Sequence, residues 1–150
     1  MLRKTIIYLT QIINMKYLEY QIQINATPEK IWETLTKNEH YTQWTNGNRF
    51  EGNWETGSEM KFFDPKNNGM YSEVVTNLPN QELKMKHLGW IYDGKLDPQD
   101  FGGSDVAYLL EPIENGTVLR GKVNSMDEFE DFYNSYFPNI FQKIKEISEG

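Results

Sequence analysis

Hydrophobic and polar residues alternate over residues 17–24, which predicts a β-strand with one buried face. The apolar positions of this strand are Leu18, Tyr20, Ile22 and Ile24. The period then changes at Thr27, a good helix N-cap, and Pro28 suits the first helical position. Asn38 is expected to cap a second short helix that ends near Trp44. The pattern therefore predicts a strand followed by two short helices.

Further alternating segments predict four to six more strands, at residues 57–63, 70–76, 82–88, 106–111 and 118–123. Asn67-Asn68-Gly69 and Glu114-Asn115-Gly116-Thr117 indicate hairpin turns, because Asn and Gly tolerate a positive φ. Consecutive strands joined by tight turns form an antiparallel meander. Residues 92–104 show no such alternation, and we expect a solvated acidic loop there or a lid over a pocket.

The C-terminal segment returns to helical spacing, with aromatic and aliphatic residues recurring every three or four positions. Ser125 and Glu128 predict a capping box at the start of this helix, which runs over residues 125–148. Pro138 is expected to kink the helix or split it into two. The apolar face of such a sheet must be covered by another element. Of the predicted elements, only this helix is long enough to cover it. The fold class is therefore α+β.

The amino-acid composition excludes several classes of function but does not indicate a particular reaction. The 150 residues include 15 basic and 22 acidic side chains, a net charge of −7, which is the wrong sign for gripping nucleic acid. The chain has no cysteine, which excludes disulfides, thiolate metal sites and cysteine nucleophiles and fits a cytoplasmic location. Two distant histidines and no glycine-rich phosphate loop give no reason to expect a metal or a cofactor.

The first 14 residues differ from the rest, because they carry Arg3 and Lys4, no acid, and an apolar run. This run is too short to span a bilayer, so we expect no membrane span. A secretory signal is one interpretation, but the segment lacks a small-residue cleavage site. The other is an N-terminal extension, residues 1–14, in front of a single domain at residues 15–150 that begins at Met15.

Three segments carry a resemblance to a known family. They are NATPEKIWETLTKNEHYTQW at 25–44, LEPIENGTVL at 110–119 and FYNSYFPNIFQKIKEI at 132–147. Their order and spacing resemble the SRPBCC (START-like) superfamily, in particular its homologues of the activator of the heat-shock chaperone ATPase. Phe137 and Pro138 stand where that family usually has Gly-Trp. The resemblance implies a helix-grip fold, in which a curved antiparallel sheet wraps the C-terminal helix around an apolar cavity.

His87 is the polar residue of most interest, because the alternation of residues 82–88 turns it inward with Leu83 and Met85. An inward imidazole orients a ligand or acts as an acid or base, unless a neighbouring hydroxyl or carbonyl simply satisfies it. Glu73 faces His87 in one register of its strand and raises the pKa of the imidazole there, whereas Ser72 faces inward in the other register.

The leading functional hypothesis is non-catalytic binding of a small apolar or amphipathic molecule between sheet and helix. The alternative implied by the resemblance is a chaperone-activator-like interaction module without a ligand, and a cyclase- or hydrolase-type enzyme ranks third. We expect a monomer or a weak homodimer. The expected ligand contacts are His87, Tyr71, Glu73, Met60, Phe62, Met85, Trp90, Tyr108, Phe132 and Tyr136.

Overall fold

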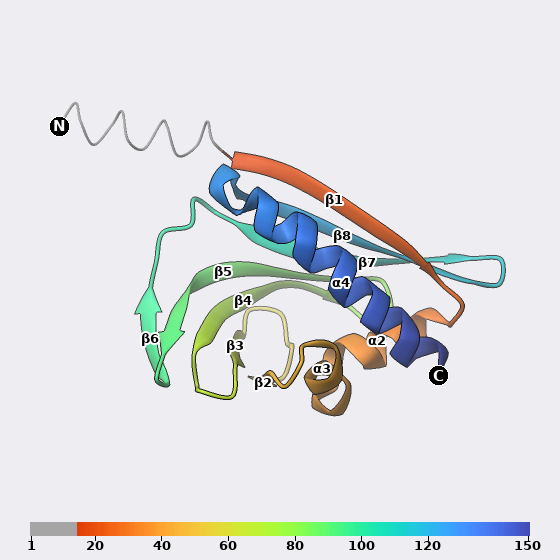
Figure 1. Ribbon diagram of the computed structural model, residues 1–150, viewed down its shortest axis with the longest axis horizontal. Helices are drawn as coiled ribbons and strands as arrows, with labels where there is room; N and C mark the ends of the chain where they lie inside the picture. Colours follow the sequence, from red (N-terminus) through yellow and green to blue (C-terminus); the bar gives the residue numbers. More distant parts are fainter. Residues whose placement is uncertain (1–14) are drawn as a thin grey trace.

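The computed structural model describes residues 15–150, and the predicted extension at residues 1–14 lies outside the described residues. The strands are β1 (Met15–Ile24), β2 (Arg49–Glu51), β3 (Glu59–Phe63), β4 (Gly69–Leu78), β5 (Glu82–Tyr92), β6 (Lys95–Pro98), β7 (Asp105–Ile113) and β8 (Gly116–Met126). The helices are α2 (Pro28–Thr36), α3 (Asn38–Trp44) and α4 (Glu130–Glu149), and a short 3₁₀ turn, η1 (Asp127–Phe129), precedes α4. This confirms the predicted helix-grip α+β fold (Figure 1).

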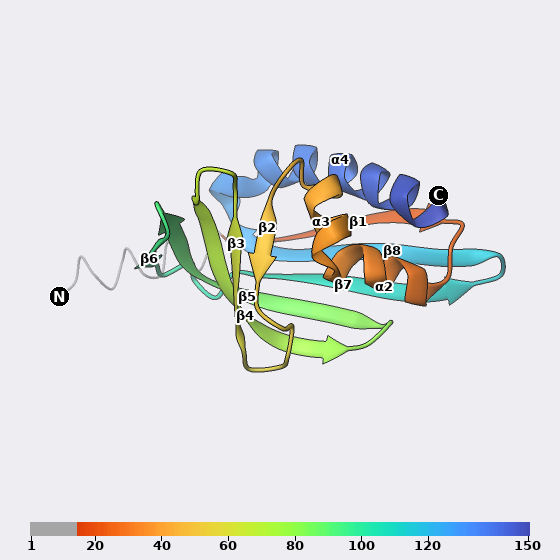
Figure 2. The ribbon, with the colours of Figure 1, turned by 90° about the horizontal axis from the view of Figure 1, so that it is seen from below.

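All eight strands join one antiparallel sheet in the order β1-β8-β7-β5-β4-β3-β2, with β6 attached to β5. The first strand therefore pairs with the last, from Met15↔Met126 to Ile24↔Thr117. Figure 2 shows α4 running along one face of the sheet, with α2 and α3 beside its C-terminal half. The helices thus cover the apolar face that the sequence pattern predicted.

The core between β8 and α4 is built of aromatic rings. Phe137 is fully buried and stacks on Tyr20 of β1, with ring centroids 4.8 Å apart and an interplanar angle of 7°. Gly121 of β8 lies beneath the helix, where an added Cβ would come within 2.9 Å of the rings of Phe137 and Phe141. The absence of a side chain at Gly121 therefore lets α4 approach the sheet closely.

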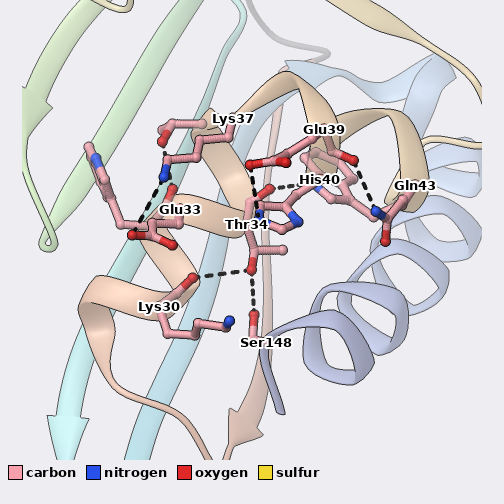
Figure 3. A network of polar contacts seen from close by, with 11 residues as sticks. Lys30, Glu33, Thr34, Lys37, Glu39, His40, Gln43 and Ser148 are labelled. Carbon is pink, nitrogen blue, oxygen red and sulfur yellow. Dashed lines mark hydrogen bonds and ion pairs between the residues drawn. The ribbon is translucent and has the colours of Figure 1, made fainter. Parts of the chain in front are cut away.

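The short helices are tied to α4 by polar contacts (Figure 3). Thr27 caps α2 as predicted, because its side chain accepts a hydrogen bond from the Lys30 amide. Inside the protein, the hydroxyls of Thr34 and Ser148 hydrogen-bond at 2.8 Å, which joins α2 to the end of α4. The Trp44 indole donates to the Thr34 carbonyl, so α3 is attached to the same point.

Two cap predictions are wrong. Asn38 does not cap α3, because its amide instead pairs with both backbone groups of Phe50 at 3.0 Å. Ser125 does not cap α4, since the ladder between β1 and β8 extends to Met126 and holds Ser125 opposite Lys16. The long helix therefore begins at Glu130, after the 3₁₀ turn.

Pro138 does not split α4, which continues through it from Glu130 to Glu149. The proline lies on the exposed side of the helix. The buried neighbours on either side, Phe137 and Ile140, hold both halves against the sheet. Packing thus offsets the loss of one backbone hydrogen bond.

The strand β5 changes partner along its length, and this positions the candidate site. It pairs with β7 from Glu82 to Lys86 and with β6 from Gly89 to Tyr92. Between these stretches its register with β4 skips Leu88, because Ser72 lies opposite His87 whereas Tyr71 lies opposite Gly89. This bulge shifts the alternation, so residues 87 and 90 both face the helix.

Residues 92–104 are not one irregular loop. Lys95–Pro98 forms the exposed strand β6, which pairs with the end of β5. Beyond this strand, Phe101 packs edge-to-face on Trp90, with ring centroids 5.3 Å apart. The segment therefore extends the sheet, and its Phe101 side chain packs beside β5.

Candidate functional site

A cavity of about 350 Å³ lies between the sheet, α3 and the first half of α4. Half of its lining residues are aromatic: Tyr41, Trp44, Trp54, Phe62, Phe63, Trp90, Tyr108, Phe132, Tyr133, Tyr136 and Phe137. The aliphatic and sulfur-containing side chains of the wall are Leu35, Leu83, Val106, Met70 and Met85, and its polar side chains are Asn48, Asp64, Asn68, Ser72 and His87. Among the described residues, Asp64 is the one carboxylate of this wall, and the wall has no lysine or arginine. The site therefore suits an apolar molecule with few polar groups.

His87 is the polar residue of this wall that the sequence pattern singled out. Its Nδ1 lies 3.1 Å from the hydroxyl oxygen of Ser72, which is itself 1% exposed. Its Nε2 is shielded from solvent and has no hydrogen-bond partner among the described residues. Burial lowers the pKa of the imidazole from 6.5 to about 4, so the ring is neutral at physiological pH.

Four tyrosines line the same cavity: Tyr41, Tyr108, Tyr133 and Tyr136. Burial, together with the neighbouring phenols, raises the pKa of Tyr108 well above 10, and it raises that of Tyr136 to about 12. These phenols therefore stay protonated and act as neutral hydrogen-bonding groups rather than as charges or bases.

The cavity reaches the surface beside Phe132 in the first turns of α4. This side chain lines the cavity although 57% of it is exposed. It stacks on Tyr136, with ring centroids 5.2 Å apart and an interplanar angle of 18°. An aromatic pair thus forms the edge of the opening.

A smaller cavity of about 140 Å³ lies on the other side of His87, towards Phe101, Ser104 and Ser125. The two cavities share Met70, His87, Trp90, Phe132 and Tyr133 as lining residues. His87 therefore borders both cavities.

Seven of the ten predicted contact residues line the main cavity: Phe62, Met85, His87, Trp90, Tyr108, Phe132 and Tyr136. The structure brings them together from the sheet and from α4. Their role in binding stays a prediction.

Three predicted contact residues do not line the cavity. Tyr71 packs with Phe63 and Ile91 in a separate cluster, because the register of β4 turns Ser72 inward instead. Glu73 follows the same register and lies opposite Lys86 and Glu59, so the Glu73–His87 pair does not form. Met60 is fully buried, and its sulfur accepts a hydrogen bond from the Trp54 amide.

Several lining residues were not among the predicted contacts, notably Ser72, Tyr133 and Val106. Tyr133 was detectable, because it is three positions from Tyr136 on the apolar side of the C-terminal helix. Ser72 was not, since a small polar residue in a strand carries no sign of which face it occupies.

The arrangement does not provide a nucleophile pair of the usual kind. Ser72 contacts Nδ1 of His87, and no carboxylate from residues 15–150 hydrogen-bonds either ring nitrogen. No three histidine, aspartate or glutamate side chains converge as metal ligands in the part of the chain that the structure describes. Within the same residues, no helix is long and apolar enough to cross a membrane.

The sheet wrapped around α4 and the apolar space between them define a helix-grip protein of the SRPBCC (START-like) class. More narrowly, the chain belongs to the family of Activator of Hsp90 ATPase homolog 1-like proteins, whose model matches residues 25–147. This confirms the family resemblance drawn from the sequence motifs.

Solved structures share this fold. The Aha1 dimer from Colwellia psychrerythraea is 26% identical over 89% of this chain and 96% of that one, with a TM-score of 0.71. Protein MLL2253 from Mesorhizobium loti is 22% identical over 88% and 96%, with a TM-score of 0.71. DynU16, from a dynemicin biosynthetic locus, is 13% identical over 87% of this chain and 46% of that one, also at 0.71. No curated protein matches the chain significantly.

Proposed function

We propose that this protein binds a small apolar or amphipathic molecule in the cavity between the sheet and α4, without catalysing a reaction on it. The observation that carries the proposal is the unpartnered Nε2 of His87, a residue of a wall in which half of the residues are aromatic. A space filled only by packing needs no such group, whereas a ligand pocket combines apolar walls with a few polar groups that fix orientation.

The volume is consistent with a small ligand. About 350 Å³ lies near the lower end of the roughly 300–1,000 Å³ range of small-molecule pockets. Apart from the Asp64 carboxylate, the wall offers neutral donors and acceptors, with no lysine or arginine among the described residues. Affinity would therefore come from burial of apolar surface, with His87 and the tyrosine hydroxyls fixing the orientation.

A cavity-filling substitution tests the proposal. Val106→Phe places a ring in the cavity, and Val75→Phe makes the same change on an exposed part of β4, where the side chain is 42% exposed. Native mass spectrometry of the purified protein, followed by extraction of bound molecules, is the first measurement. We expect an extra mass on the wild type and on Val75→Phe, and none on Val106→Phe.

Thermal unfolding with a panel of neutral aromatic compounds and lipids extends the test. A ligand at about 100 times its Kd stabilises the native state by about 2.7 kcal/mol, a clear shift in Tm. Stabilisation of Val75→Phe but not of Val106→Phe supports binding in the cavity. A wild type that carries no extra mass and is stabilised by no compound contradicts the proposal.

The second candidate function is a chaperone-activator-like interaction without a ligand. Its support is the family match and the similarity to the Colwellia psychrerythraea protein. A ligand-free result in the experiments above, together with binding to a heat-shock chaperone, favours this candidate. In either case we propose a cytoplasmic protein that is a monomer or a weak homodimer, which sedimentation at several concentrations tests.

A further inference from the structure

The unpartnered nitrogen of His87 also indicates the chemistry of the ligand. The ring borders both cavities, but Nε2 itself is closed off from them in this structure, so a ligand reaches it only after the ring or its neighbours shift. A buried polar atom without a hydrogen bond destabilises the native state, and such atoms are few in folded proteins. A ligand that supplies the missing partner removes this cost on binding.

The hydrogen bond between Ser72 and Nδ1 determines whether Nε2 of His87 is a donor or an acceptor. A neutral imidazole carries one proton, so if the Ser72 hydroxyl donates to Nδ1, then Nε2 bears the hydrogen. In the opposite arrangement Nδ1 donates to the Ser72 oxygen. Both the hydroxyl hydrogen of Ser72 and the lone pair of Nε2 are then left without a hydrogen-bond partner. His87 is the one hydrogen-bond partner of the Ser72 side chain among residues 15–150. The first arrangement leaves fewer groups unsatisfied, so Nε2–H is a donor.

The rest of the wall limits the charge of the partner. Among the described residues the wall has no lysine or arginine, and its one carboxylate is Asp64. An anionic ligand would bury its charge without a counter-ion, which is strongly unfavourable. The acceptor that meets Nε2–H is therefore a neutral oxygen. The aromatic walls favour a flat skeleton, since rings pack well face to edge or offset.

We infer that the ligand is an uncharged, flat apolar molecule with a carbonyl oxygen that accepts a hydrogen bond from Nε2–H of His87, held in this tautomer by Ser72. This inference rests on the proposed function, because it specifies the chemistry of a ligand in the same cavity. The inference predicts that neutral aromatic ketones bind more tightly than fatty acids and aromatic acids, although all of these compounds have similar apolar surface.

Three compounds of one skeleton test it: 2-acetylnaphthalene, 2-ethylnaphthalene and 2-naphthoate. Calorimetric titration of the full chain gives Kd for each compound. We expect the ketone to bind about fivefold more tightly than the hydrocarbon, the usual effect of one neutral hydrogen bond. The carboxylate is expected to bind most weakly of the three.

His87→Phe keeps a flat ring but removes the donor, so the ketone should lose its advantage while the hydrocarbon still binds. The matched control is His40→Phe, which removes the other histidine from a position outside both cavities. It should retain the preference for the ketone. Ser72→Ala frees the tautomer of His87 and should reduce the preference without removing the ring.

Long-range nitrogen NMR of the wild type reads the tautomer directly and needs no variant to fold. A protonated Nε2 on His87, assigned by comparison with His40→Phe, supports the inference, and a protonated Nδ1 overturns it. Equal binding of ketone and hydrocarbon, or tightest binding of the carboxylate, overturns it while leaving cavity binding intact. If none of the three compounds binds, the inference fails, and the proposed function fails with it only when the wild type also carries no extra mass and is stabilised by no other compound.

Discussion

Acidification is expected to destabilise the protein through His87. The pKa of this imidazole falls from 6.5 to about 4 on folding, because burial disfavours the charged ring. The folded state therefore binds fewer protons than the unfolded state between these two values. Above about pH 6.5 the burial of His87 does not reduce the free energy of unfolding through protonation. The free energy of unfolding then decreases as the pH falls towards 4.

The magnitude follows from linkage. Each pKa unit corresponds to about 1.4 kcal/mol, so His87 removes about 3 kcal/mol in total once the pH is below both values. Between about pH 7.5 and pH 5 the loss is about 2 kcal/mol. For a domain with a stability of about 5–15 kcal/mol this is a large effect.

Urea denaturation of the wild type and of His87→Phe at several pH values measures this loss. The other titrating groups act in both proteins, so the difference between the two curves isolates His87. Between about pH 7.5 and pH 5, we expect the free energy of unfolding of His87→Phe to fall by about 2 kcal/mol less than that of the wild type. Met85→Leu, a change on the same wall that keeps the imidazole, should follow the wild type. Parallel curves for the wild type and His87→Phe would refute the reasoning.

Two further predictions concern the contacts of α4. Gly121→Val should reduce the free energy of unfolding by about 1–3 kcal/mol in urea denaturation, because its side chain meets the rings of Phe137 and Phe141; an unchanged midpoint would show that the helix moves aside freely. Thr34→Val should cost about 1–3 kcal/mol, because it strands the buried hydroxyl of Ser148. Adding Ser148→Ala should then recover part of the loss, and a purely additive double variant would argue against coupling between these residues.

Local sequence signals predicted the elements whose cause is local. The cap at Thr27, the Asn115-Gly116 hairpin and the alternation from Leu83 to His87 each depend on a few adjacent residues, and the structure confirms all three. Asn115 has a φ of +68°, as that turn requires. The family resemblance then supplied the arrangement of the helix against the sheet, which periodicity alone does not determine.

The errors arose where a distant segment decides the outcome. Ser125 has the spacing of a capping box, but pairing with β1, more than a hundred positions earlier, keeps it in a strand. Lys95–Pro98 is exposed throughout and has no alternation, so only its pairing with β5 makes it a strand. Tyr71 and Glu73 were assigned to the cavity face, and one residue of register reversed them. No local pattern contains this information.

The change of partner along β5 also bears on how relatives of this protein would diverge. The ladder between β5 and β7 ends at Lys86, and the chain returns to β7 only after β6 and residues 99–104. An insertion or deletion in this connection would move the point at which β5 leaves β7, and with it the bulge after His87 that turns Trp90 inward. Evolution thus has a means of reshaping the cavity from a surface loop, while every residue that lines the cavity stays the same.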